Sequence, residues 1–96
     1  MDIAKIVEEI RESWMGDVRP NVSSPLGESK VRDLYSKLYD LAPKIETYSL
    51  IYCLHYSRII MDTIIEGRTP PQGVLNLFDQ NISQLYLSTR PREAVR

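Results

Sequence analysis

The stretch PKIETYSLIYCLHYSRIIMDTIIEG, residues 43–67, decides the fold predicted for this chain. It has no internal glycine or proline, so one helix, about 35 Å long at 1.5 Å per residue, can run through it. Projected at 3.6 residues per turn, most of its circumference is apolar, and only one seam stays polar: His55, Arg58, Asp62 and Glu66. A helix that is apolar on most sides is buried on several sides, so we expect the other helices or another chain to wrap it.

A membrane span does not fit this stretch. A spanning helix needs about 20 mostly apolar residues, and ionisable groups at mid-depth are costly. His55, Arg58 and Asp62 lie well inside the stretch. We therefore interpret it as a core helix and expect no membrane partner.

Length and charge indicate one small folded domain. The chain has 96 residues, a formal net charge of -1 and a hydrophobic fraction of 43%, which is too apolar for general disorder. A nearly neutral chain is unlike a dedicated nucleic-acid binder, which usually carries a basic face. We predict a single helical domain over residues 1–88 and a flexible basic tail, or the start of a linker, over residues 89–96.

Cysteine and histidine usage limits the chemistry. Cys53 and His55 are the single residues of their kinds, so an intrachain disulfide and a Cys/His zinc site are excluded. The start of the chain lacks the basic-then-apolar pattern of a signal peptide. We expect an intracellular protein, cytoplasmic in an archaeal cell or viral host or else nuclear, with no cofactor and no metal.

The remaining segments predict three more helices. The first covers residues 2–15, with Asp2 as its cap and Gly16 in the left-handed position at its end. Residues 16–27 hold two prolines, two glycines and two serines without periodicity, which favours a linker or an extended crossing segment. The apolar stripe of the first helix consists of Ile3, Ile6, Val7, Ile10 and Trp14.

The second helix should begin between Pro25 and Ser29 and end before Pro43, because proline removes an amide donor. The fourth should run from Pro70 to about Leu87 after a capping box at residues 69–72. No segment alternates with period two, so the predicted class is all-α: about four helices around the long apolar one, without a substantial sheet. The expected buried positions are Val31, Leu34, Tyr35, Leu38 and Leu41 in the second helix, and Val74, Leu75, Phe78, Ile82, Leu85 and Tyr86 in the fourth.

Each polar candidate has a functional and a structural interpretation. Asp62 can orient Arg58 toward an anionic group of a partner, or the two can form an ordinary i,i+4 ion pair on a solvated edge. His55 is more typical of a helix histidine than of a general base, and Cys53 more typical of a small core residue than of a reactive thiol. No phosphate loop or nucleophile elbow is present, so we predict no catalytic residues and no enzyme.

Tyrosine is unusually frequent, with six residues against one phenylalanine. Tyr48, Tyr52 and Tyr56 follow one another at i+4, which is typical either of a half-buried ladder or of an interface with large rigid side chains. Both interpretations stay open. The candidate partner-interface residues are Trp14, Tyr48, Tyr52, Tyr56, Arg58, Asp62, Phe78 and Tyr86.

Three stretches taken together carry a family resemblance: IVEEIRESWM at residues 6–15 followed by Pro20, the helix at 31–41, and LIYCLHYSRIIMDTI at 50–64. The chain resembles the helical domain of GINS subunits in which that domain comes first. The fourth helix fits in order and length. The resemblance matches the family's leucine, aromatic and arginine on its long central helix to Leu54, Tyr56 and Arg58.

The GINS resemblance implies a non-enzymatic scaffold that supports assembly of the replicative DNA helicase. Its partners would be other GINS-type subunits, the MCM ring and a RecJ-like protein, in a homo- or hetero-oligomer. It implies that Tyr56 and Arg58 fix the central helix against its neighbour and that Trp14 anchors the first helix. Two departures are the missing small β domain after the helices and the weaker basic character around Arg58. Either this sequence covers the helical domain alone or the chain is a shortened relative.

Two further functions remain open from the residues. One is a stand-alone helical adaptor or homodimeriser, for example viral or plasmid-encoded, without a role in replication. The other is a weak nucleic-acid-binding module that uses the scattered arginines, although direct nucleic-acid binding is not the expectation from the net charge. The arginines concerned are Arg68, Arg90, Arg92 and Arg96.

Overall fold

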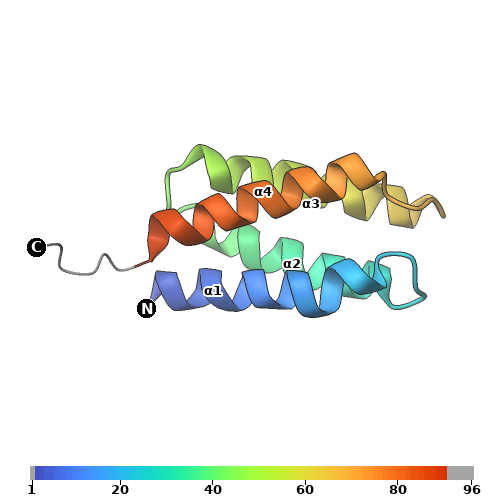
Figure 1. The fold of residues 1–96 in the computed structure, drawn as a ribbon, viewed down its shortest axis with the longest axis horizontal. Helices are drawn as coiled ribbons and strands as arrows, with labels where there is room; N and C mark the ends of the chain where they lie inside the picture. Colours follow the sequence, from blue (N-terminus) through green and yellow to red (C-terminus); the bar gives the residue numbers. More distant parts are fainter. Residues whose placement is uncertain (1, 91–96) are drawn as a thin grey trace, which may run out of the picture.

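The computed structural model describes residues 2–90, and within them the chain forms four helices without a strand (Figure 1). The prediction of an all-α fold is confirmed. Successive helices run in opposite directions, and each pair of consecutive helices is joined at one end of the molecule. The four are α1 (Ile3–Ser13), α2 (Gly27–Leu41), α3 (Tyr48–Ile65) and α4 (Gln72–Thr89).

The four helices surround one shared core. α3 packs against α2 and α4, and α1 closes the bundle by packing against α4 and α2. α1, α2 and α4 turn the apolar stripes predicted for them toward this core. Five of the predicted positions are only partly buried: Ile3, Ile6, Tyr35, Val74 and Tyr86. The largest fully buried side chains come from all four helices, among them Ile10, Trp14, Leu34, Leu38, Leu50, Ile60, Phe78 and Ile82.

α3 differs from the helix predicted over residues 43–67 in two ways. It begins at Tyr48, because Thr47 is extended and its hydroxyl accepts the Leu50 N–H at 3.2 Å, which is an N-cap. It is also one wall of the bundle: Cys53 and Ile60 are fully buried, whereas the opposite side of the helix is not covered. The other helices of the described chain therefore cover only the inner side of α3, and of the two covers expected from the sequence, only another chain could lie over its outer side.

The connection from α1 to α2 is helical over its first part, which corrects the prediction of a linker or extended segment for residues 16–21. α1 continues into a π-helical turn (Trp14–Val18) and then a 3-10 turn (Arg19–Asn21). Val18 and Val22 are buried one turn apart and hold this segment against the core. Gly16 lies inside the π-helical turn, so it does not take the predicted left-handed conformation. Among the described residues only Gly67, after α3, has a positive φ, of 79°.

The ends of the other helices match the sequence more closely. Asp2 caps α1 by accepting the Lys5 N–H at 3.2 Å, and α2 begins at Gly27, within the predicted window. α4 begins after Pro71 without a side-chain cap, so the predicted capping box is not formed. α4 continues to Thr89, which was expected in the tail. The rest of that tail, residues 91–96, lies outside the described residues.

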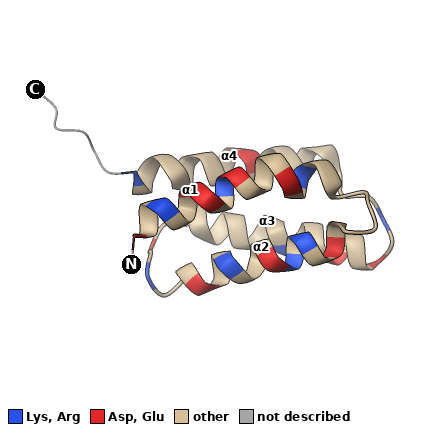
Figure 2. Ribbon diagram, turned by 90° about the horizontal axis from the view of Figure 1, so that it is seen from below, with Lys and Arg blue, Asp and Glu red and all other residues tan. Residues whose placement is uncertain are grey.

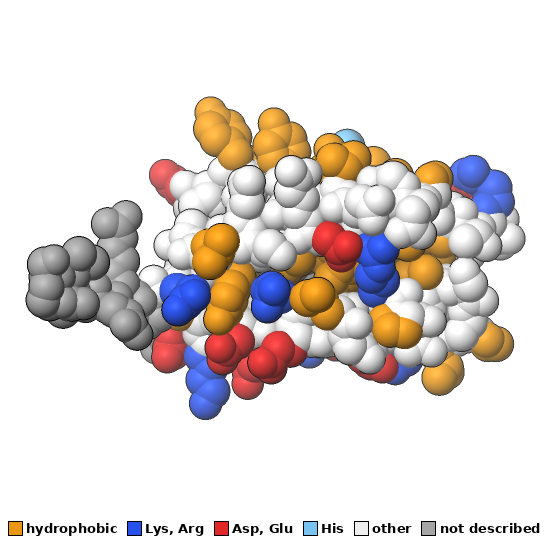
Figure 3. Space-filling view, viewed as in Figure 1, with side chains coloured by type: hydrophobic (Ala, Val, Ile, Leu, Met, Phe, Trp, Pro, Cys, Tyr) orange, Lys and Arg blue, Asp and Glu red, His pale blue; other side chains and the backbone are white. Residues whose placement is uncertain are grey.

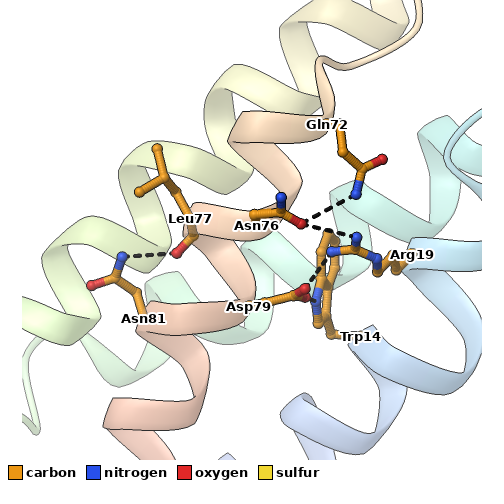
Figure 4. Close-up of polar contacts among 7 residues, drawn as sticks. All are labelled: Trp14, Arg19, Gln72, Asn76, Leu77, Asp79 and Asn81. Carbon is orange, nitrogen blue, oxygen red and sulfur yellow. Dashed lines mark hydrogen bonds and ion pairs between the residues drawn. The ribbon is translucent and has the colours of Figure 1, made fainter.

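A polar cluster joins the end of α1 to α4 (Figure 4). The Trp14 indole is fully buried and packs on the Phe78 ring with centroids 4.3 Å apart. Its Nε1 donates a hydrogen bond of 2.6 Å to Asp79, and Arg19 forms an ion pair with the other oxygen of the same carboxylate. Asp79 therefore satisfies a buried indole donor and holds the helical connection against α4.

Asn76 extends this cluster along α4. Arg19 donates a second hydrogen bond, of 3.2 Å, to the Asn76 side-chain oxygen, which also accepts from Gln72 at 3.1 Å. One turn further, Asn81 donates to the Leu77 carbonyl at 2.8 Å. The guanidinium of Arg19 thus contacts two successive turns of α4, which fixes the direction in which the chain leaves α1.

We predict that Asp79→Ala destabilises the fold by about 1–3 kcal/mol, because it leaves the Trp14 indole donor buried without its acceptor. Urea unfolding followed by circular dichroism measures the change. In a Trp14→Phe background the same substitution should cost less, since the donor is already gone.

Asp33→Ala is the matched control, because it breaks an exposed i,i+4 pair with Lys37, and such pairs contribute about 0–1 kcal/mol. Equal losses for Asp79→Ala and Asp33→Ala would contradict the structural role of the cluster.

We also predict that Ile60→Asp abolishes folding, because Ile60 is fully buried and an unpaired charge there costs several kcal/mol. Ile51→Asp is the control: it makes the same change on the uncovered side of the same helix and should cost less than about 1 kcal/mol. Thermal unfolding of both variants is the measurement. A cooperative, near-native transition for Ile60→Asp would show that the assignment of the faces of α3 is wrong.

Candidate functional site

The outer side of α3 presents a row of apolar and aromatic side chains to solvent. Tyr48 is 78% exposed, Ile51 56% and Tyr52 46%, and the exposed His55 continues the row. In Figure 3, hydrophobic side chains accordingly project from the edge of the molecule formed by α3, beside the single histidine. We call these four residues, with the half-buried Tyr56 and Ile59 beside them, the α3 surface.

The helical repeat explains why these residues lie together. On α3 the positions that enter the core recur at Leu50, Cys53, Ser57, Ile60 and Met61. Residues half a turn away from these positions must point outward, and in the first half of α3 those residues are apolar. The α3 surface is therefore a direct consequence of an apolar helix placed in the wall of a bundle.

The rings on the α3 surface contact one another. Tyr52 and Tyr56 are stacked with centroids 6.3 Å apart, and His55 meets the edge of Tyr56 at 5.2 Å. From Tyr48 to Tyr56 the exposure falls, because a spacing of four residues drifts around a helix of 3.6 residues per turn. The predicted ladder of Tyr48, Tyr52 and Tyr56 is thus exposed at its beginning and half-buried at its end.

An apolar groove lies beside the α3 surface, where the connection between α2 and α3 turns. Its volume is about 500 Å³. Glu46 is among its lining residues, and Tyr48 and Ile51 belong both to the groove and to the α3 surface. The groove is large enough to receive a side chain of a binding partner. Its lining residues are Ala42, Ile45, Glu46, Thr47, Tyr48, Leu50, Ile51 and Leu54.

The second half of α3 carries charges on the same outer side. Arg58 and Asp62 form the predicted i,i+4 ion pair at 3.2 Å, and both are exposed. The Tyr35 hydroxyl on α2 and the Asp62 carboxylate raise the pKa of Arg58, so the guanidinium stays charged. Glu66 pairs with Arg68 just after the helix. The predicted seam His55, Arg58, Asp62 and Glu66 is therefore exposed along its length, with the apolar residues beside its first half.

Three predicted interface residues lie elsewhere. Trp14 and Phe78 are fully buried in contact with each other, so neither offers surface to a partner in this fold. Tyr86 is half-buried on α4, where its ring lies 4.9 Å from the Arg11 guanidinium and 5.6 Å from that of Arg90. Of the predicted set, the α3 surface keeps Tyr48, Tyr52 and Tyr56, with Arg58 and Asp62 at its charged end.

Sequence reasoning missed Ile51 as a surface residue and missed the groove. Ile51 lies three residues after Tyr48 and four before His55, so its place on the polar seam was readable from the spacing. The groove depends on the path of the chain between α2 and α3, and no local pattern indicates that path.

Cys53, the one cysteine of the chain, lies buried in the core. Burial raises the pKa of the Cys53 thiol to about 12, so it stays protonated and inaccessible at neutral pH. Within residues 2–90 no group of His, Cys, Asp or Glu side chains is arranged to hold a metal ion. In the same part of the chain, no helix has both the length and the apolar character that crossing a bilayer requires.

Charge is unevenly distributed over the bundle (Figure 2). α1 and α2 carry alternating acidic and basic residues, whereas α3 contains only Arg58 and Asp62, and α4 only Asp79. The apolar outer side of α3 is therefore set apart from the charged half of the molecule. A function must be inferred from this surface itself, since comparison of the chain with protein-family models, with curated proteins and with solved structures finds no match.

Proposed function

We propose that this protein is a non-enzymatic interaction module that binds a protein partner through the α3 surface. The observation that carries the proposal is the contiguous exposure of Tyr48, Ile51 and Tyr52 on one helix. Single exposed apolar residues are ordinary on a protein surface, but a contiguous apolar patch is typical of an interaction site. Tyrosine is enriched at interfaces because it adds a large, stiff area and a polar tip.

The position of the patch supports binding over accidental exposure. The side chains are mounted on an 18-residue helix whose other face is packed in the core, so little conformational entropy is lost when they are covered. The groove next to Tyr48 supplies the concave element that receives an anchoring side chain. The charged residues around the patch have both signs, Glu46 and Asp62 against Arg58, which suits a protein partner better than an anionic polymer.

A finer form of the proposal makes the module a GINS-type scaffold for the replicative helicase. It rests on the resemblance of residues 6–15, 31–41 and 50–64 to the helical domain of GINS subunits. The third of these stretches also forms most of α3, so both forms of the proposal place the partner on one helix. Co-purification with GINS-type subunits, the MCM ring and a RecJ-like protein tests the finer form. An adaptor without a replication role would show no enrichment of these proteins.

We predict that a photo-cross-linking residue in place of Tyr48 forms covalent protein adducts in cells that express the chain, because this position would lie at the centre of the contact. Mass spectrometry of the adducts identifies the partner. The matched control is the same residue in place of Leu87, which is 61% exposed on α4 and lies outside the α3 surface. Adducts from position 87 alone, or from neither position, would refute the assignment of the surface.

A further inference from the structure

The charges that flank the α3 surface follow a self-complementary order. Glu46 and Arg58 lie equally far from Tyr52 along the chain, one on each side, and no Asp, Glu, Lys or Arg lies between them. Further out lie Lys44 before Glu46 and Asp62 after Arg58. The signs therefore run positive, negative, apolar centre, positive, negative, so each sign is reversed on the opposite side of Tyr52.

Such an order is what a two-fold interface between identical chains requires. In an isologous contact one patch faces its own copy, and antiparallel helices bring each residue before the centre against one after it. With the centre near Tyr52, Glu46, which lies just before the N-cap of α3, would come close to the partner's Arg58, and the symmetry would repeat that pair. A parallel arrangement would oppose like charges, which costs free energy.

We propose that the occupant of the α3 surface is a second copy of this chain, packed antiparallel about a two-fold axis near Tyr52. This inference rests on the proposed function and names its partner. The apolar centre made by Tyr48, Ile51 and Tyr52 would be covered by the same residues of the partner. The two Glu46–Arg58 contacts would lie at the rim, where they set orientation and register more than affinity.

The size of the α3 surface limits the expected affinity of the dimer. A helix of 18 residues is about 27 Å long. Of its four exposed large apolar side chains, three lie in the first half, and only Ile65 lies in the second. The contact is therefore at the small end of specific interfaces, which bury about 800 Å² per partner at standard size. We expect a reversible dimer with a dissociation constant in the micromolar range.

Charge reversal tests the register directly. Glu46→Arg and Arg58→Glu should each weaken dimerisation about tenfold or more, because each converts two attractive contacts into two repulsive ones. Sedimentation equilibrium over a concentration series measures the constant. Arg32→Glu is the control: Arg32 is 53% exposed and paired with Glu28 at i,i+4, much as Arg58 is 58% exposed and paired with Asp62. Arg32→Glu should leave dimerisation unchanged.

Two combinations separate a specific pairing from a general loss of structure. The doubly reversed chain, Glu46→Arg with Arg58→Glu, should recover dimerisation, since its opposed charges attract again. An equimolar mixture of the two singly reversed chains should form heterodimers in preference to either homodimer, because both charge pairs are then attractive. Native mass spectrometry of the mixture resolves the three species. Tyr48→Ser should weaken all dimers and Leu87→Ser none.

The inference is overturned if the chain stays monomeric up to millimolar concentration, or if dimers form that neither reversal weakens and no combination restores. If the chain is monomeric but position 48 still cross-links to another protein, self-association is wrong and the proposed function is supported. If the chain is monomeric and position 48 gives no adducts, both proposals are wrong. Adducts of twice the chain mass, together with rescue by the double reversal, would establish the homodimer.

Discussion

A helix in the wall of a four-helix bundle can bury only the side that faces the core, and this limit shapes the whole molecule. α1 and α2 carry charged residues on the outer sides that face solvent. In the first half of α3, by contrast, both the inner and the outer side are apolar. Its inner residues, such as Leu50 and Ile60, are covered by α2 and α4. The outer residues remain in water because the chain has no further helix in the described part to place over them. The surface assigned to binding is thus what a small bundle leaves uncovered.

The interactions that stabilise the bundle lie away from that surface. Trp14 packs on Phe78 and is hydrogen-bonded to Asp79, which joins α1 to α4. α3 reaches the core through its inner residues and leaves Tyr48 and Ile51 without a structural task. We therefore expect substitutions on the outer side to cost little stability. An apolar surface that folding does not need favours association with other molecules.

Local sequence patterns predicted the helices well, because each helix has a clear apolar periodicity and ends near a glycine or proline. The patterns failed where a residue's environment depends on which helices pack against each other. Trp14 and Phe78 were assigned to a partner interface, although Trp14, in the turn after α1, packs on Phe78 of α4 in the same chain. The helical turns at residues 16–21 were missed because prolines and glycines suggest a linker, whereas the buried Val18 and Val22 hold this segment against the core. The sequence showed that α3 is apolar on most sides. Which of its sides faces solvent depends on how α2 and α4 pack against it, and the sequence did not show that.

Self-association and binding of another protein would use the same side chains, so the two exclude each other on any one chain. If a partner binds only the monomer, its apparent affinity for the protein falls in proportion to the fraction of chains that are monomeric. With a micromolar dimer, that fraction is large at low concentration and falls as the protein accumulates. The antiparallel pairing would then shield the apolar surface when copies are abundant, while a partner with a better-fitting anchor for the groove could still displace the second copy. A weak homodimer is consistent with an interaction module for this reason, and a tight one would leave the surface unavailable to any other protein.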